Sequence, residues 1–332
     1  MIPEDVHEIA DPIHGPSAWL ESDLSKSHDW VYRLSDAEIA EIDAALRSVQ
    51  ARGIALTEIS AEDFPLPTVA PVIRLWENDL HHGRGFVLVR GFPAERYSEE
   101  EISIVYWGIG QHLGIPVSQN ADGDLLGHVR DTGADPDDPS VRLYKTRRRQ
   151  DFHTDGSDII GLICLHGGKS GGESQIVSSV SIFNEVLRRR PDLVPLLFEP
   201  FYWDAHEQQS EGEAPYWVYP ICSYSGSQLR TFFVAWYIRN AQRHDDVPRL
   251  TREQNELIEL IEEIANDPDF RLDMNFEVGD MQFLKNSVIL HARGEYEDWD
   301  EPAKKRHLLR LWLAAHTIEN SDPLFRAGVR KK

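Results

Sequence analysis

From about residue 141 onward, the sequence consists largely of short runs of apolar, β-branched and aromatic residues with turn residues between them. Such runs are typical of strands, and a chain that has many of them is expected to fold as a β-sandwich or a jelly roll. The expected strands are 141–146, 159–166, 173–179, 217–223, 229–237, 276–283, 287–291 and 307–315, with helices at 182–190 and 252–266. We therefore predict an α+β fold that is mainly β, with a jelly-roll core and helices packed outside it.

The first part of the chain has helical patterns instead. Ser35 and Glu38 form a capping-box pattern, and apolar residues follow it at helical spacing. The expected elements are helices at 35–53, 71–81 and 98–113 and a strand at 85–91, followed by a loop over 117–140. We expect one domain over 1–332, in which an N-terminal arm and helices (1–83) precede the jelly-roll core (84–316).

Composition narrows the classes of function. The formal net charge is −22 and the pI is near 5.0, which argues against nucleic acid or anionic membrane as the main partner, because these require clustered Lys and Arg. The two cysteines, Cys164 and Cys222, are too few for a disulfide framework, which indicates a reducing compartment. The N-terminus lacks a secretory pattern, and no apolar run approaches the length of a membrane span. We expect a soluble, cytoplasmic protein.

The stretch 150–158 reads Q-D-F-H-T-D-G-S-D and stands directly before an apolar strand-like run. Side chains at i and i+2 of an extended segment point to the same face, so His153 and Asp155 can reach one metal ion together. A simple turn, in which Asp155 binds nearby backbone N–H groups, is the alternative interpretation. His291, at the end of the apolar run N-S-V-I-L-H, would complete a set of two histidines and one carboxylate. Such a facial triad binds iron(II) and leaves positions open for oxygen and a co-substrate.

A basic segment, K-K-R-H-L-L-R-L-W-L, lies near the end of the chain. Arg306 and Arg310 are four residues apart, so on a strand both point to the same face. Each guanidinium group can bind a carboxylate through two parallel hydrogen bonds. The pair therefore suits a dicarboxylate co-substrate or an anionic substrate, although a basic strand that pairs with acidic neighbours is also possible in a chain of this charge.

Five motifs together resemble the taurine dioxygenase-like (TauD/TfdA) family of Fe(II)- and 2-oxoglutarate-dependent oxygenases. They are F-H-T-D (152–155), G-G-E-S (171–174), G-D (279–280), N-S-V-I-L-H-A-R (286–293) and R-H-L-L-R-L-W-L (306–313). They occur in the order of the family and cover about residues 84–315. The resemblance implies a double-stranded β-helix, which is the jelly-roll core expected above, and it implies Fe(II), 2-oxoglutarate and O2 as cofactors.

The resemblance also implies roles for individual residues. His153, Asp155 and His291 would be the iron ligands. Arg306, fifteen residues after His291, would hold the distal carboxylate of 2-oxoglutarate, assisted by Ser174. Arg310 would bind either the other carboxylate of 2-oxoglutarate or an anionic group of the substrate, and the sequence leaves this choice open, together with the choice of Arg306 or Arg310 as the main clamp.

Substrate contacts are expected from Gln119 and Asn120, in the loop after the third helix, and from Tyr144. Each also reads as an ordinary polar or packing residue. The expected reaction is oxidation of an unactivated C–H bond of a small molecule that bears a carboxylate or an amine, by hydroxylation or by desaturation or cyclisation, with release of succinate and CO2. Similar proteins are frequently dimers or tetramers, so the sequence leaves a homo-oligomer and a monomer as alternatives.

Two other classes use similar ligands. A cupin-like isomerase or metal-binding protein would share the jelly roll without 2-oxoglutarate chemistry. A zinc hydrolase would use the triad to activate water, but the sequence shows no suitably placed glutamate as general base. In both classes the paired arginines would have no purpose, so the oxygenase is favoured.

Overall fold

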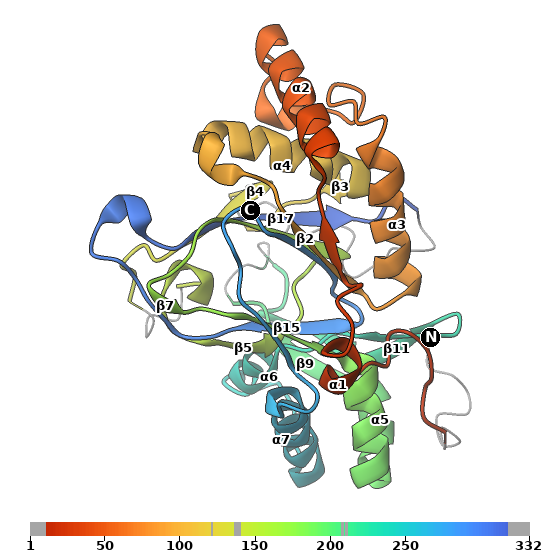
Figure 1. The fold of residues 1–332 in the computed structure, drawn as a ribbon. Coiled ribbons are helices and arrows are strands. Elements are labelled where there is room, and N and C mark those ends of the chain that lie inside the picture. Colours follow the sequence, from red (N-terminus) through yellow and green to blue (C-terminus); the bar gives the residue numbers. More distant parts are fainter. Residues whose placement is uncertain (1–10, 121, 136–140, 207–208, 210–211, 318–332) are drawn as a thin grey trace.

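Two β-sheets face each other at the centre of the computed structural model, which describes residues 11–120, 122–135, 141–206, 209 and 212–317 (Figure 1). The large sheet has the order β1-β2-β14-β6-β17-β3, and β4 also pairs with β17. The small sheet has the order β13-β8-β15-β5. Its pairs are antiparallel, as are those of the large sheet apart from β1 with β2. This arrangement of two facing sheets agrees with the expected jelly roll.

The strands of the large sheet are β1 (Val31–Arg33), β2 (Phe86–Arg90), β3 (Ile115–Pro116), β4 (Leu126–Val129), β6 (Ile159–His166), β14 (Met281–Lys285) and β17 (His307–Ala314). Those of the small sheet are β5 (Gln150–His153), β8 (Ser174–Ser178), β13 (Leu272–Met274) and β15 (Ile289–Arg293). Three short ribbons pair β7 (Ser170–Gly171) with β16 (Tyr296–Glu297), β9 (Pro200–Asp204) with β10 (Tyr216–Pro220), and β11 (Cys222–Ser225) with β12 (Gln228–Thr231).

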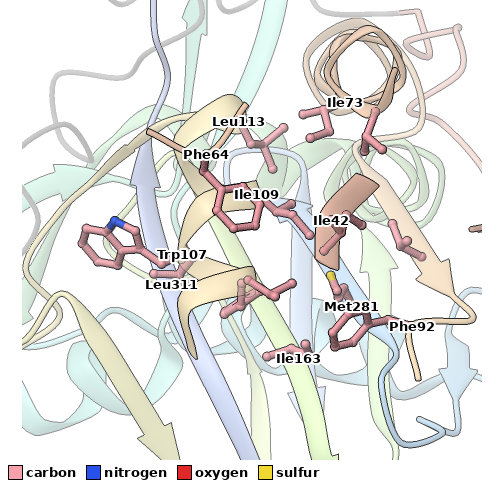
Figure 2. Close-up of a cluster of buried hydrophobic side chains, with 14 of the residues drawn as sticks. Ile42, Phe64, Ile73, Phe92, Trp107, Ile109, Leu113, Ile163, Met281 and Leu311 are labelled. Carbon is pink, nitrogen blue, oxygen red and sulfur yellow. The ribbon is translucent and has the colours of Figure 1, made fainter. Parts of the chain in front are cut away.

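Three helices cover the outer face of the large sheet, namely α2 (Asp36–Arg52), α3 (Val69–His82) and α4 (Glu99–Leu113) (Figure 1). Figure 2 shows Ile42 of α2, Ile109 of α4 and Ile163 of β6 among the side chains of one buried cluster. Successive side chains of each strand point alternately to the two faces of the sheet, as the two-residue period of a strand requires. Ile159 and Ile163 of β6 join this helix-covered cluster, whereas Ile160 belongs to a cluster on the inner face of the sheet.

The small sheet is covered on its outer side by α5 (Ser179–Arg189), α6 (Ala235–Ala241) and α7 (Arg252–Asn266) (Figure 1). These helices and the ribbons of β9 to β12 form a second large cluster of buried side chains. Phe201 and Trp203 are fully buried within this cluster. They therefore belong to the core.

The N-terminal arm packs against one end of the sandwich. It contains the short helix α1 (Glu21–Leu24), and Trp19 and Trp30 bury their rings beside Phe86. The indole of Trp19 donates to the carbonyl of Arg84 at 3.0 Å. An N-terminal arm was expected, but no pattern in the sequence indicated that it would contribute to the core.

The expected helices at 35–53, 71–81, 98–113, 182–190 and 252–266 are all present, with ends shifted by at most three residues. The first begins with the expected capping box at Ser35 and ends at Gly53, whose φ of 65° is left-handed. Of the loop expected at 117–140, residues 121 and 136–140 lie outside the described residues, and the rest contains β4, a strand that the sequence did not indicate.

Four expected strands were wrong or misplaced. Residues 141–146 contain a 3₁₀ turn (Leu143–Lys145), and the strand at 217–223 divides at Ile221 into β10 and β11. The run 229–237 ends as a strand at Thr231 and continues as α6, because Ala235, Ile238 and Ala241 have helical spacing that the aromatic residues between them conceal. The strand expected from 276 begins only at Met281, since a turn at Gly279, with φ of 90°, precedes it.

Candidate metal centre and co-substrate cavity

His153 and His291 come together because β5 and β15 pair in the small sheet. The two residues are direct partners in the antiparallel ladder, and direct partners project from the same face of a sheet. Their ring centroids are 4.3 Å apart. The pairing of β5 with β15 thus brings together two histidines that are distant in the sequence.

Asp155 follows β5 at the start of a fixed turn. Thr154, between the two expected ligands, exchanges hydrogen bonds with Phe233: its N–H donates to the carbonyl of Phe233 at 2.9 Å, and its hydroxyl accepts from the N–H at 3.0 Å. The N–H of Asp155 donates to Oδ1 of Asn286 at 3.1 Å. The segment H-T-D is thus held on both sides, with His153 and Asp155 on the face opposite to Thr154.

The ligand atoms of these three residues converge. Asp155 Oδ1 is 3.7 Å from His153 Nε2, and Asp155 Oδ2 is 3.7 Å from His291 Nε2. All three ligand atoms lie within 4.8 Å of one another. Two nitrogens and one carboxylate oxygen on one side of a point are a facial donor set for an octahedral metal ion.

The ionisation states suit metal binding. Burial and then the neighbouring His291 ring lower the pKa of His153 to about 3, so its imidazole is neutral at pH 7. Nδ1 of His153 lies 2.8 Å from the carbonyl of Asp151 and must donate its proton to it, which leaves the lone pair on Nε2. Burial opposes the ionisation of Asp155, yet Arg310 and the two histidines hold its pKa well below its usual range.

A cavity of about 40 Å³ lies beside this cluster, between the two sheets. The small sheet contributes His153, Ser174 and His291 to its lining, and the large sheet contributes Leu162 and Arg310. The further lining residues are Val129, Tyr144, Gln150, Asp155, Ile160, Phe276, Ala292, Arg293, Arg306 and Leu308. The cavity is therefore apolar on the β6 side and cationic where the arginines enter it.

Arg306 is only 5% exposed and has no carboxylate within ion-pair distance in the described part of the chain. Its Nη2 donates to the carbonyl of Gly172 at 3.3 Å, but its Nη1 is buried and has no hydrogen-bond partner among the described residues. The guanidinium lies over the ring of Tyr296 at 5.0 Å, and burial lowers the pKa of Arg306. Gly172, with φ of 77°, permits this approach, since a Cβ there would lie 3.0 Å from Nε of Arg306.

Arg310 occupies the other end of the arginine pair, next to the triad. Its Nη1 is 3.5 Å from Asp155 Oδ2, and its guanidinium stacks 4.6 Å from the ring of Tyr144. Its Nε donates to Oε1 of Gln119 at 2.7 Å. The two arginines thus point to the same cavity, as the spacing predicted, but only Arg310 already has an anionic neighbour.

The remaining candidates divide into two groups. Ser174 and Tyr144 line the cavity, and the hydroxyl of Ser174 donates to Gln282 at 3.0 Å. Gln119 lies behind Arg310, with its amide donating to the carbonyls of Leu125 and Arg310. Asn120 is outside the cavity and holds its own loop through bonds to Asp122 and Asp124. Gln119 and Asn120, which the sequence analysis expected to contact a substrate, are not among the residues that line the cavity.

Four further residues matter to the site, and the sequence analysis did not single them out. Trp312 donates its indole N–H to Asp155 Oδ2 at 3.0 Å, and Gln150 places its amide nitrogen 3.0 Å from His153 Nε2. Asn286 fixes the turn after Asp155. Arg293 lies 5.1 Å from the ring of Tyr296, which Arg306 also contacts, and two of its nitrogens have no hydrogen-bond partner among the described residues. The alternation Arg310-Leu-Trp312 on β17 was the one signal that could have indicated Trp312.

Comparison with known proteins decides the family. Residues 51–312 match the profile described as taurine catabolism dioxygenase TauD, TfdA family. The chain belongs to the TauD/TfdA family. It is 30% identical over 322 residues to FR-33289 synthase of Streptomyces rubellomurinus, which covers 95% of this chain and 93% of that protein. It is 33% identical over 321 residues to the taurine hydroxylase-like protein SAT17 of Stachybotrys chartarum, covering 92% and 80%.

Solved structures show the same fold. An asparagine oxygenase in complex with Fe(II), 3-hydroxyasparagine and succinate is similar with a TM-score of 0.66 at 14% identity, over 86% of this chain and 93% of that one. The oxygenase OrfP in complex with Fe and α-ketoglutaric acid, which is 2-oxoglutarate, is similar with a TM-score of 0.67 at 16% identity, over 91% and 99%. The expected jelly-roll core and TauD/TfdA family are confirmed.

This TauD/TfdA protein is a non-haem Fe(II)- and 2-oxoglutarate-dependent dioxygenase, and its cofactors are Fe(II), 2-oxoglutarate and O2, as the sequence predicted. Its general reaction is that of this class of enzyme, in which O2 and 2-oxoglutarate are used to oxidise a substrate. Within the described residues, every helix is too short or too polar to span a lipid bilayer.

Proposed function

We propose that His153, Asp155 and His291 hold the Fe(II) ion of this TauD/TfdA enzyme. The observation that carries the proposal is the convergence of their three ligand atoms within 4.8 Å at the edge of a cavity with two arginines. Imidazole nitrogens and a carboxylate oxygen are ligands that iron(II) accepts, and one open side leaves room for a bidentate co-substrate. The side-chain amide of Gln150 donates a hydrogen bond to the lone pair of His153 Nε2, so Gln150 would move aside when iron binds there.

Arg306 is proposed to bind the distal carboxylate of 2-oxoglutarate, with Ser174 as a second donor. A buried charge without a partner is costly, and Nη1 of Arg306 is such a group in the described part of the chain. A carboxylate at the far end of the cavity from the triad would complete its hydrogen bonds. Arg310 is less suited to this role because Asp155 and Gln119 already engage it.

Arg310 is proposed to bind an acidic group of the substrate beside the metal. Its fork lies between Tyr144 and Trp312, with ring distances of 4.6 and 5.1 Å, and its Nη1 faces the triad. The aromatic faces hold the guanidinium in one orientation, so that a carboxylate bound to it would have a fixed position relative to the iron. The solved relatives that bind hydroxylated asparagine and hydroxylated arginine support a small substrate with a carboxylate and an amine.

When bound, Fe(II) with 2-oxoglutarate and O2 supplies oxidation of an unactivated C–H bond, with release of succinate and CO2. The proposed outcome is hydroxylation of a small carboxylate- or amine-bearing molecule, or a desaturation or cyclisation of it. Ile160, Leu162 and Leu308 keep the inner wall apolar, which excludes water from the reacting centre. Arg306 and Arg310 orient the co-substrate and the substrate at opposite ends of this wall.

We also propose that residues 1–332 form one domain. The described part of the N-terminal arm supports this, because Ser181 of α5 donates to the carbonyl of Trp19 at 2.7 Å and Asn184 bonds both backbone groups of Ile13 at 2.8 Å. The arm thus joins the helices of the small sheet to β2 of the large sheet.

The test is an anaerobic titration of the purified protein with Fe(II) and then 2-oxoglutarate, following the weak visible metal-to-ligand charge-transfer band. We expect the band with the wild type and with Asn120→Ala, a matched variant outside the cavity. It should be absent with His153→Ala and weakened with Arg306→Ala. Tight iron binding by a folded wild-type protein without any band would overturn the 2-oxoglutarate assignment and would favour the cupin-like class instead.

A further inference from the structure

A second group of two histidines and one carboxylate lies on the outer side of the large sheet. Glu99 is in the first turn of α4, His128 is in β4, and His307 begins β17. β4 pairs with β17 so that His128 is opposite Leu309, two residues from His307 and therefore on the same face. That face is the one covered by α4, which places Glu99 above the two rings.

One ligand atom from each of Glu99, His128 and His307 lies within 4.8 Å of the other two, which is close enough to share one ion. His128 Nδ1 is 2.9 Å from His307 Nε2 and 3.7 Å from Glu99 Oε1, and Glu99 Oε2 is 3.7 Å from His307 Nδ1. Bonds of about 2.0–2.2 Å to a tetrahedral Zn²⁺ separate neighbouring ligand atoms by about 3.3–3.6 Å. The 2.9 Å contact uses Nε2 of His307, whereas the contact with Glu99 Oε2 uses Nδ1 of the same ring. The half-exposed carboxylate of Glu99 must therefore rotate towards Nε2 of His307 to close the set around one ion.

The protonation of the group also suits a metal ion. Burial lowers the pKa of His307 to about 4, against the opposing effect of Glu99, with His128, Arg130 and His166 lowering it further. Its imidazole is therefore neutral at pH 7. The 2.9 Å contact joins two imidazole nitrogens, and one shared proton satisfies it. A metal ion can replace that proton and use both lone pairs.

We propose that Glu99, His128 and His307 form a second metal site, separate from the His153–Asp155–His291 triad, that takes a divalent ion of the Zn²⁺ class. Two imidazoles and one carboxylate favour Zn²⁺ over Mg²⁺ or Ca²⁺, which prefer oxygen ligands. The side chains of Glu99 and His128 are 52% and 41% exposed, and that of His307 is 8% exposed. The ion thus enters from solvent, and water completes its fourth position.

The proposed site joins α4, β4 and β17 at the point where β17 begins. Arg306, the proposed 2-oxoglutarate clamp, directly precedes His307 and faces the opposite side of the sheet. A bound ion would fix the first residue of that strand from outside. The site would therefore act as a staple next to the co-substrate end of the cavity, without touching the cavity itself.

The experiment counts bound Zn²⁺ by equilibrium dialysis of the full chain and metal analysis, in two backgrounds. The wild type should bind about two equivalents, and Asp155→Ala/His291→Ala, which removes the triad, should retain about one. Adding Glu99→Gln and His128→Asn should remove that equivalent, or weaken its binding roughly tenfold or more, as expected on loss of two ligands. Glu100→Gln is the matched control, because Glu100 is an equally exposed neighbour in the same helix turn.

Circular dichroism and the unfolding midpoint of each variant establish that it is folded, and both substituted side chains of the second site are exposed enough to change without loss of the core. Zn²⁺ should raise the midpoint of the triad-free protein and of its Glu100→Gln form, but not that of its Glu99→Gln/His128→Asn form. The proposal is overturned if the folded triad-free protein binds no zinc, or if Glu99→Gln/His128→Asn binds as much as its parent. If the wild type and the triad-free protein both bind one equivalent of zinc, the result counts against metal binding at the triad and not against the second site. The failures of the two proposals are therefore distinguishable.

Discussion

The two groups of histidines and a carboxylate differ in what surrounds them, although their ligand types are the same. In the inner triad, the Asp155 carboxylate receives the Trp312 indole, the Asp155 N–H is held by Asn286, and His153 is oriented by a backbone carbonyl. In the outer group, His128 and His307 hold each other and Glu99 is half-exposed. Strand β17 touches both, with Trp312 facing inward and His307 facing outward.

The difference in surrounding hydrogen bonds suits the two groups, which have the same two histidines and one carboxylate, to different uses. The proposed inner ligands are held by hydrogen bonds before any ion binds, so the open positions of a bound ion would have defined directions, which a reaction on a bound substrate requires. The outer ligands can adjust to an ion but define no direction for a further ligand. We infer that buried supporting hydrogen bonds, more than the ligands themselves, make the inner group suited to catalysis.

The largest expected effect comes from removing one histidine of each group. His291→Ala should abolish the 2-oxoglutarate charge-transfer band and weaken Fe(II) binding by at least about a hundredfold, since even supporting residues change metal affinity 10- to 100-fold. His128→Ala should leave the band unchanged. Fe(II) titration with both variants checks this. A band that survives in His291→Ala would contradict the proposed difference between the inner triad and the outer group.

The next effect concerns the arginines on the inner side of the large sheet. Arg306→Ala should raise the KM for 2-oxoglutarate roughly 10- to 150-fold, because a charged hydrogen-bond partner contributes about 1.5–3 kcal/mol. Arg310→Ala should act mainly on the KM of the organic substrate, or on uncoupled 2-oxoglutarate turnover while the substrate is unidentified. Succinate release measured against 2-oxoglutarate concentration distinguishes them, and equal effects of both variants would contradict separate roles.

A smaller effect should follow from loss of one supporting bond in the inner group. Trp312→Phe keeps an aromatic ring in the core and removes the N–H donated to Asp155. We expect roughly tenfold weaker Fe(II) binding with a small change in unfolding midpoint. Trp107→Phe is a control, because its indole bonds a carbonyl of Ile59 far from the triad. Identical Fe(II) affinities in the two variants would show that ligand support is not what distinguishes the groups.

The smallest effect tests the two residues that the sequence marked as substrate contacts. Gln119→Leu leaves Nε of Arg310 without its acceptor and should raise the KM of the substrate roughly fivefold, at a cost of about 1 kcal/mol. Asn120→Ala should not change that constant, since Asn120 bonds only within its own loop. Steady-state kinetics of both variants provides the measurement, and an effect of Asn120→Ala alone would reverse this assignment.

The sequence predicted what depends on local pattern. The H-x-D spacing placed His153 and Asp155 on one face, and the four-residue spacing placed Arg306 and Arg310 in one cavity. Helices with clear caps, such as that beginning after Thr251, were also predicted closely. These features follow from periods of 2 and 3.6 residues, which are read within a few positions.

What the sequence could not give depends on pairing between distant segments. No local signal states that His291 lies opposite His153, or that β4, itself unpredicted, places His128 beside His307. Gln119 looked like a pocket residue because its loop did, but its amide is used to hold Arg310. Roles of this kind follow from hydrogen bonds that form only after the sheets have assembled.

The Trp312 indole would give this enzyme an optical reporter of the proposed iron centre. Its N–H is 3.0 Å from an oxygen of Asp155, so a paramagnetic ion bound there would lie within a few bond lengths of the fluorophore. Emission from this tryptophan would be quenched as the iron site fills and restored when a chelator empties it. Occupancy of the inner centre can thus be followed continuously without substrate, and the Trp312→Phe protein supplies the background from the remaining tryptophans.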